Sequence, residues 1–273
     1  MILYPNAKIN IGLNVLEKRE DGFHNLETLF YPVGVVENPS DGLVPDQVVD
    51  VLEIVEAPEL QMLQYGIEYP GDPMDNLCIK AYQALRKDFD IPPVAIHLYK
   101  KIPVGAGLGG GSSDAAFTLR GLNEMFSLGL SDAQLAAYAA TLGSDCAFFI
   151  YNRPMIGTGR GEILEPAEIY PLDEYEIKMV YPPYFVSTAA AYGGIVPRNK
   201  RAANGEKFDS RQLVEMLSAP VETWKECVVN DFETTVFAKI PELAPYKDEL
   251  YAQGAVYASM SGSGSSFFGI FRK

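Results

Sequence analysis

Five glycines fall within the seven residues from Gly105 to Gly111, and this segment constrains the chain more than any other feature. The alternating residues before it, 94–98, predict a strand, and apolar residues at helical spacing follow from Ser112. Glycine allows positive φ angles and close approach of a ligand. The start of a helix presents N–H groups without intrahelical acceptors and the positive end of the helix dipole. Strand, glycines and helix together predict a site for a phosphate chain at residues 103–113.

Other glycine motifs fit this segment less well. Gly105, Gly107 and Gly110 match G-x-G-x-x-G, but two predicted helices follow where a dinucleotide-binding fold requires a second strand ending in an acidic residue. The Walker pattern G-x-x-x-x-G-K-[ST] is absent, as are the H-R-D and D-F-G motifs of protein kinases. A flexible linker is the plain alternative, although linkers rarely combine a strand, a proline and a helix start.

Apolar periodicity predicts a mixture of strands and helices in the first part of the chain. Residues 9–16 and 25–35 alternate around an Asp21-Gly22 turn and predict two antiparallel strands. Residues 37–47 and 57–74 are rich in proline and glycine and predict irregular structure. Further strands are predicted at 48–55, 94–100 and 147–151, and helices at 75–87, 112–126 and 131–142, the last opened by a Ser131–Gln134 capping box.

The pattern changes near residue 153, where we place a domain boundary. Later strands are predicted at 175–181, 255–260 and 267–272, with helices near 209–218, 231–238 and 241–252. Strands and helices occur in runs rather than in strict alternation, which favours the α+β class.

Composition excludes several functional classes. The formal net charge of −14 argues against nucleic acid or an anionic membrane as the main partner. No stretch reaches about 18 apolar residues, and the first residues do not form a signal peptide, so a cytoplasmic protein without a membrane partner is expected. Cys78, Cys146 and Cys227 lie far apart, which predicts reduced thiols rather than a disulfide framework or a zinc site.

The glycine-rich segment resembles the phosphate-binding motif P-x-x-x-G-L-G-S-S-x-A of the GHMP kinase superfamily, through Pro103, Gly107, Leu108 and Gly109. The longer form G-L-G-G-G-S-S-[DN]-A-A is typical of the branch that acts on 4-diphosphocytidyl-2-C-methyl-D-erythritol. Further segments resemble that branch in the same order along nearly the whole chain: residues 7–10, 19–28, 143–149, 159–162, 187–192, 230–233 and 260–265. Cys146-Ala147 replaces the usual Val-Pro of the branch, a local departure.

This resemblance implies a two-domain α+β fold. Residues 1–153 would form the N-terminal ATP-binding domain, in a fold shared with ribosomal proteins, and residues 154–273 a ferredoxin-like C-terminal domain, with the active site in the cleft between them. The implied reaction transfers the γ-phosphoryl group of ATP, with Mg²⁺, to the 2-hydroxyl of 4-diphosphocytidyl-2-C-methyl-D-erythritol, in the non-mevalonate isoprenoid pathway. The expected enzyme is a monomer or a homodimer acting on this small cytidine-diphosphate-linked substrate.

The resemblance also implies two catalytic residues. Asp145 would accept the proton of the attacking hydroxyl, and Lys8 would pair with Asp145 and stabilise the developing charge. From spacing alone, Asp145 could equally end the preceding helix and Lys8 could be an ordinary lysine at a strand start. No metal ligand is assigned.

Nucleotide and substrate residues follow in the same way. ATP binding is assigned to the whole segment that comprises Pro103, Val104, Gly105, Ala106, Gly107, Leu108, Gly109, Gly110, Gly111, Ser112 and Ser113. The resemblance assigns the cytosine ring to Phe23, His24 and Tyr192, whose aromatic rings can stack on a base, and the erythritol hydroxyls or a nearby phosphate to Asn10. Exposed loop aromatics of this kind can also form only a small lid cluster.

Some segments stay without a single role. Residues 261–266 could be a hairpin turn or could close over the substrate, Asp114 could cap the helix or help hold Mg²⁺, and Lys100-Lys101 could add positive charge near ATP. Residues 159–162 and the loop 37–47 are given no role. Two rival functions are another GHMP kinase, such as a homoserine or mevalonate kinase, and a non-catalytic RNA-binding module, against which the net charge speaks.

Overall fold

The computed structural model describes residues 1–36, 48–68, 71–207 and 211–273, and the chain divides into two compact units. Unit 1 consists of Met1–Lys8, Pro32–Val104 and Gly109–Arg153, and unit 2 of Ile9–Tyr31, Gly105–Leu108 and Pro154–Lys273. The glycine-rich segment therefore passes from unit 1 into unit 2 and back. The predicted loop at 37–47 lies outside the described residues. The boundary near residue 153 between an ATP-binding domain and a ferredoxin-like domain stays a prediction.

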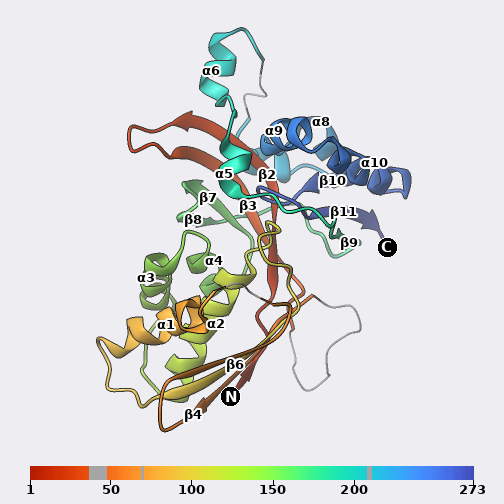
Figure 1. The fold of residues 1–273 in the computed structure, drawn as a ribbon. Helices are drawn as coiled ribbons and strands as arrows, with labels where there is room; N and C mark the ends of the chain where they lie inside the picture. The colour runs from red at the N-terminus through yellow and green to blue at the C-terminus, as the bar shows by residue number, and fades with distance from the viewer. Residues whose placement is uncertain (37–47, 69–70, 208–210) are drawn as a thin grey trace. The chain divides into compact units, whose positions relative to one another are not determined.

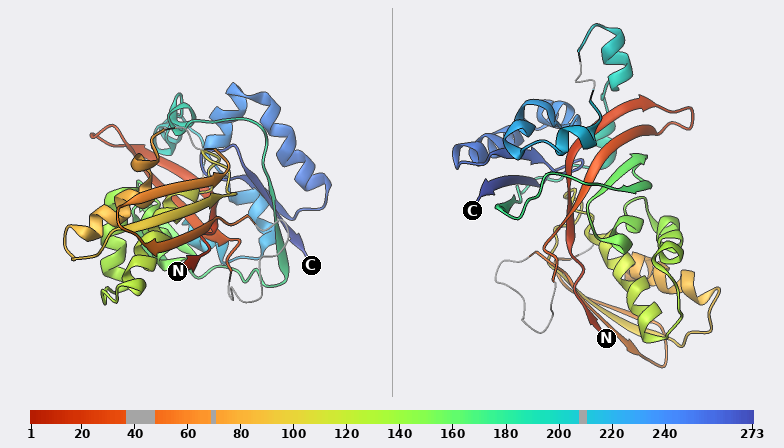
Figure 2. Two further views of the ribbon diagram at one scale, coloured as in Figure 1. Left: turned by 60° about the horizontal axis from the view of Figure 1, so that its bottom comes forward. Right: turned by 180° about the vertical axis from the view of Figure 1, so that it is seen from behind.

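Unit 1 is a sheet with helices on one face (Figures 1 and 2). The strand order is β1-β4-β6-β5, with β4 antiparallel and β5 parallel to β6. Fully buried side chains such as Ile54, Ile96 and Leu119 form the core between the sheet and the helices. The elements are β1 (Ile2–Leu3), β4 (Val51–Glu56), β5 (Gln61–Gly66), η2 (Pro73–Asp75), α1 (Leu77–Arg86), β6 (Val94–Lys100), α2 (Gly110–Met125), α3 (Asp132–Leu142) and α4 (Cys146–Tyr151).

Most predicted elements of unit 1 are confirmed, with shifted ends. The capping box of Ser131 and Gln134 opens α3, whereas α1 is capped by Asn76 and α2 begins at Gly110 rather than at Ser112. Two predictions are wrong: residues 57–74 contain the strand β5, and residues 147–151 belong to the helix α4. A short, fully apolar run has no periodicity to distinguish a buried helix from a buried strand, which explains the second error.

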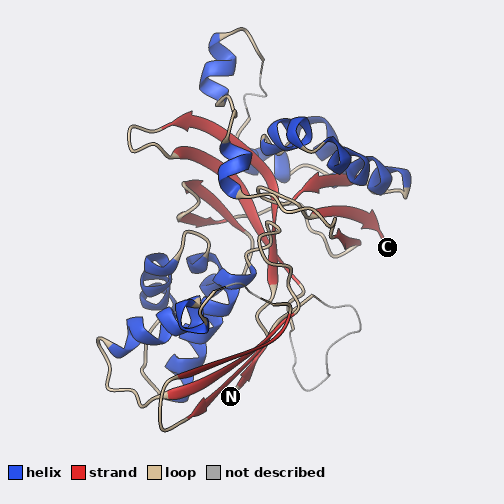
Figure 3. Cartoon of the chain, viewed as in Figure 1, coloured by secondary structure: helices blue, strands red, loops and turns tan. Residues whose placement is uncertain are grey.

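Unit 2 contains two antiparallel sheets (Figure 3). One has the order β2-β3-β7-β8 and the other the order β10-β11-β9. The strands are β2 (Ala7–Lys18), β3 (His24–Val33), β7 (Met155–Gly159), β8 (Ile163–Pro166), β9 (Tyr175–Val180), β10 (Tyr257–Met260) and β11 (Phe267–Arg272). The helices are α5 (Thr188–Tyr192), α6 (Arg198–Ala203), α7 (Leu213–Leu217), η3 (Val221–Thr223), α8 (Trp224–Cys227), α9 (Phe232–Lys239), η4 (Pro241–Leu243) and α10 (Ala244–Ala252).

The strongly periodic segments of unit 2 are confirmed as β2, β3, β9, β10, β11, α9 and α10. The helix expected at 209–218 is α7, and its predicted first residues overlap positions outside the described chain. The short elements β7, β8, α5, α6 and α8 had no clear sequence signal. The α+β class is confirmed. None of the helices within the described ranges is long and apolar enough to cross a bilayer.

Asn230 anchors the connection between β10 and β11. Its side-chain amide donates to the backbone oxygens of Met260 and Gly262, each at 2.8 Å, and its side-chain oxygen accepts from the N–H of Phe232 at 3.0 Å. Asn230 is 2% exposed, so water does not replace these partners. The start of α9 therefore determines the position of the connection at residues 261–266.

We predict that Asn230→Asp destabilises the protein by about 1–3 kcal/mol, because a carboxylate keeps the shape of the side chain but cannot donate to two buried carbonyl oxygens. Urea unfolding followed by circular dichroism measures the change. The exposed Asn204 provides a matched Asn204→Asp control, for which about 0.5 kcal/mol or less is expected. Equal unfolding midpoints for the two variants would contradict the anchoring role.

Candidate active site

Lys8 and Asp145 form an ion pair in unit 1. The Nζ atom of Lys8 lies 3.4 Å from Oδ2 of Asp145, and the side chains are 4% and 32% exposed. Lys8 lies near the start of β2, and Asp145 directly precedes α4. The Asp145 side chain makes no capping hydrogen bond to that helix. The structure thus brings the two predicted catalytic residues together, with a partly exposed carboxylate that does not serve as a helix cap.

The start of α2 lies beside this ion pair. Gly109 precedes the helix with φ +71°, and a Cβ atom there would lie 3.0 Å from the Phe149 ring and 3.1 Å from Cε of Lys8. Only glycine fits this conformation without strain. The first turn, Gly110 to Ser113, contains no acidic residue, and Gly109 supplies no side-chain cap. The predicted phosphate-binding turn is therefore open to an anion next to Lys8.

The middle of the glycine-rich segment is held within unit 2. A Cβ atom at Gly107 would lie 2.1 Å from the backbone oxygen of Ser261, so the two backbones touch. The Ser261 hydroxyl donates to the Gly107 oxygen at 3.0 Å, and the N–H of Ser266 donates to the Ala106 oxygen at 3.2 Å. The connection 261–266 is thus a hairpin turn and also the support of the glycine-rich segment.

Side chains alternate along this segment between buried and open positions. Ala106 and Leu108 are buried, at 7% and 1% exposure, whereas Val104 is 38% exposed. Pro103 is half-buried. The buried apolar side chains fix the segment between its glycines.

Asn10 lies in unit 2 against the same hairpin. Its side-chain amide donates to Oγ1 of Thr28 at 3.0 Å, and its backbone N–H donates to the Ser261 hydroxyl at 3.3 Å. A Cβ atom on Gly262 would lie 3.0 Å from Oδ1 of Asn10. Asn10 is thus a buried polar residue that is packed beside the glycine hairpin.

The structure brings together two of the three aromatic residues predicted to hold the base. The rings of His24 and Tyr192 stack with centroids 5.0 Å apart and planes at 19°, and Phe232 packs edge-on against Tyr192. Burial and the charge of Lys18 lower the pKa of His24, which favours a neutral imidazole. Phe23 is instead 54% exposed, and the guanidinium carbon of Arg160 lies 5.0 Å from its ring centroid. This contact connects residues 159–162, which had no predicted role, to Phe23.

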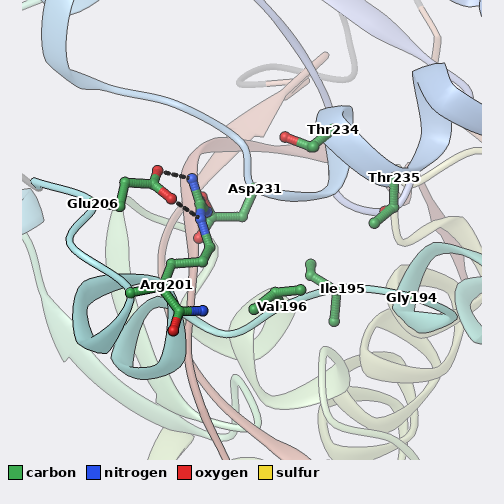
Figure 4. A pocket seen from close by; sticks show the side chains of 9 residues that line it. Gly194, Ile195, Val196, Arg201, Glu206, Asp231, Thr234 and Thr235 are labelled. Atoms are coloured by element: carbon green, nitrogen blue, oxygen red, sulfur yellow. Dashed lines mark hydrogen bonds and ion pairs between the residues drawn. The ribbon is translucent and has the colours of Figure 1, made fainter.

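A cavity of about 440 Å³ in unit 2 contains none of the predicted site residues. It is bordered by the chain after α5, by α6 and by the start of α9 (Figure 4). The charged groups at its edge pair with one another: Arg201 contacts both Glu206 and Asp231, and Arg198 contacts Asp231 at 2.8 Å. The carboxylate of Asp231 also accepts from the Val15 N–H at 2.8 Å, so this network connects α6 to β2.

Sequence reasoning missed a buried charge cluster at the two ends of the glycine-rich segment. Lys100 contacts both Asp50 and Asp114, and all three side chains are buried. Asp114 therefore does not cap α2. Asp50 carried no motif, and its only signal was a carboxylate just before an apolar strand. Among the described residues, no group of three or more His, Cys, Asp or Glu side chains could hold a metal ion.

The chain matches two family profiles. The GHMP kinases N terminal domain matches residues 76–153, and the GHMP kinases C terminal domain matches residues 215–273. The protein described as 4-diphosphocytidyl-2-C-methyl-D-erythritol kinase from Bacteroides thetaiotaomicron is 50% identical over 99% of this chain and 92% of its own length. The protein of the same description from Cytophaga hutchinsonii is 45% identical over 99% of this chain and 92% of its own length.

Solved structures show the same relationship. A crystal structure of 4-(cytidine 5'-diphospho)-2C-methyl-D-erythritol kinase has a TM-score of 0.78 and 32% identity, over 98% of this chain and 89% of that one. A homoserine kinase from Cytophaga hutchinsonii has a TM-score of 0.65 at 18% identity, over 98% of this chain and 86% of that one, and so shares the fold. On these similarities the chain belongs to the 4-diphosphocytidyl-2-C-methyl-D-erythritol kinase family of the GHMP kinases.

Proposed function

We propose that this protein transfers the γ-phosphoryl group of ATP to the 2-hydroxyl of 4-diphosphocytidyl-2-C-methyl-D-erythritol, giving the 2-phosphate and ADP. The observation that carries the proposal is the Lys8–Asp145 ion pair beside the glycine-flanked start of α2. Phosphoryl transfer needs a cradle for the phosphates, positive charge near the transferred group and an oriented nucleophile. These residues supply the cradle, the charge and a proton acceptor.

Asp145 accepts the proton of the attacking hydroxyl. Its side chain is 32% exposed, so a substrate hydroxyl can reach the carboxylate, and Nζ of Lys8 lies 3.4 Å from Oδ2. Lys8 is 4% exposed, so its ammonium group lies shielded from water beside this carboxylate. As charge develops on the substrate oxygen, the same ammonium group stabilises it.

The phosphates of ATP are assigned to residues 103–113. The open first turn of α2 and the buried Ser113 hydroxyl, which has no protein partner within the described chain, fit a ligand that brings hydrogen-bond acceptors. Mg²⁺ neutralises phosphate charge during transfer when it is bound. Among the described residues no group of three or more His, Cys, Asp or Glu side chains could hold a metal ion, and we assign no protein ligand to Mg²⁺.

The cytidine group of the acceptor is assigned to Phe23, His24 and Tyr192, and its polyol or phosphate groups to Asn10. Tyr192 and His24 provide aromatic faces, and a neutral His24 can donate or accept hydrogen bonds at the edge of a base. We further expect a cytoplasmic enzyme that works as a monomer or a homodimer.

The direct test is ADP release with ATP and Mg²⁺, using 4-diphosphocytidyl-2-C-methyl-D-erythritol, homoserine, mevalonate and galactose as alternative acceptors. Turnover with the cytidine-linked acceptor alone is expected. Turnover with a different alcohol would keep the kinase and reject the cytidine site.

For Asp145→Asn we expect kcat to fall by about 10²–10⁴-fold, because the amide cannot accept the hydroxyl proton. ATP affinity, measured by calorimetry, should change little. Asp132→Asn, on the exposed first turn of α3, is the matched control and should keep wild-type kcat. A kcat within about twofold of wild type for Asp145→Asn would remove this carboxylate from the mechanism.

For Tyr192→Leu we expect KM for the acceptor to rise by about 5–150-fold, the range that corresponds to losing one base–aromatic stack of about 1–3 kcal/mol. KM for ATP should stay unchanged. Tyr192→Phe keeps the ring and should behave as wild type. Equal KM values for the Leu and Phe variants would show that the ring does not contact the base.

A further inference from the structure

The cluster of Asp50, Lys100 and Asp114 connects three segments of unit 1. Asp50 lies just before β4, Lys100 is the last residue of β6, and Asp114 is the fifth residue of α2. Nζ of Lys100 donates to Oδ2 of Asp114 at 2.8 Å and also to Oδ2 of Asp50. The three residues are 0%, 5% and 2% exposed, in chain order, so these bonds are shielded from water.

The same cluster holds both ends of the glycine-rich segment. On the strand side, Oδ1 of Asp50 accepts from the backbone N–H groups of Lys101 at 2.6 Å and of Ile102 at 2.9 Å, the last residues before Pro103. On the helix side, a Cβ atom on Gly110 would lie 3.0 Å from Nζ of Lys100 and 2.9 Å from the side chain of Ile102. The start of α2 is therefore packed directly on the end of β6.

We propose that Lys100 is a positioning residue for ATP binding: by bonding Asp50 and Asp114 together, it fixes the end of β6 and the start of α2, and so the phosphate-binding turn. The inference rests on the proposed function in that this turn binds the phosphates of ATP. Lys100 acts through the backbone of residues 101–113 and has no contact with the reacting groups in this proposal.

Charge balance selects Asp114 as the residue to change. Without Lys100, two buried carboxylates would face each other, which destabilises the fold as a whole. Without the Asp114 carboxylate, Lys100 still pairs one-to-one with Asp50, and only the bond to α2 is lost. Burial raises the pKa of Asp114, with Lys100 opposing and Asp50 adding to this effect. An asparagine keeps the shape of the side chain, and its amide oxygen can still accept a hydrogen bond from Lys100.

The experiment compares Asp114→Leu with Asp114→Asn in the full-length protein. Calorimetry measures the Kd of Mg²⁺ with a non-hydrolysable ATP analogue, and steady-state kinetics gives KM for ATP, KM for the acceptor and kcat. We expect about tenfold weaker analogue binding and a matching rise in KM for ATP in Asp114→Leu, the effect of losing one charge-assisted hydrogen bond that orders the site. KM for the acceptor should stay within about twofold, and Asp114→Asn should match wild type in all four values.

A general loss of stability is controlled by Leu85→Ala, a fully buried change in α1. This variant should unfold at a lower temperature and still bind the analogue with wild-type Kd. If Asp114→Leu does not fold, Asp114→Ala takes its place, assayed below its own unfolding transition. Wild-type Kd in a folded Leu or Ala variant overturns the proposal, as does an Asn variant that binds as weakly as the Leu variant. Because analogue binding needs no acceptor, a wild-type protein that binds the analogue without turnover rejects the proposed reaction and leaves this test intact.

Discussion

The phosphate-binding turn that we propose would hold its ligand with backbone N–H groups at a helix start, and the segment before it has a backbone that most residues cannot adopt. Gly105, Gly107 and Gly109 have φ between +69° and +79°, and buried Ala106 and Leu108 separate them. The glycines give the segment its curvature, and the apolar side chains fix it in place. The Ser261 hairpin, its anchor Asn230 and the Lys100 cluster all serve to keep this one segment in a defined shape.

The two halves of the proposed chemistry differ in how they are supported. Lys8, near the start of β2, and Asp145, directly before α4, belong to unit 1. Asn10, His24 and Tyr192 belong to unit 2, where β2, β3 and α5 carry them. Since β2 begins in unit 1 and continues into unit 2, Lys8 and Asn10 are only two residues apart in the chain. In the proposed reaction, one strand thus supplies a catalytic residue at its start and an acceptor-binding residue directly afterwards.

The sequence was most informative where a residue pattern is compatible with only one kind of local structure. A helix after the glycines, a Ser–Gln capping box and a long alternating strand were predicted correctly in outline, as α2, α3 and β2. The assignment of residues 103–113 to phosphates stays a prediction. Residues 147–151 were assigned to a strand, because a buried apolar run lacks periodicity. The pairing of Lys8 with Asp145 followed only from family resemblance, since contacts across 137 positions leave no local pattern. Asp50 was missed for the same reason: its side-chain partners Lys100, Lys101 and Ile102 lie 50 to 52 positions away in the chain.

Because the glycine-rich segment depends on partners far away in the sequence, the motif alone does not make the proposed binding site. A synthetic peptide of residues 103–116 would contain every glycine, both serines and Asp114, yet neither Asp50 nor Lys100 nor the Ser261 hairpin. Such a peptide lacks the bonds that restrict its backbone, so ordering it around a nucleotide would cost conformational entropy at every residue. In the intact chain the segment is ordered when unit 1 and unit 2 fold, before any nucleotide binds. Affinity for the nucleotide would therefore depend on the folded protein and not on the segment alone.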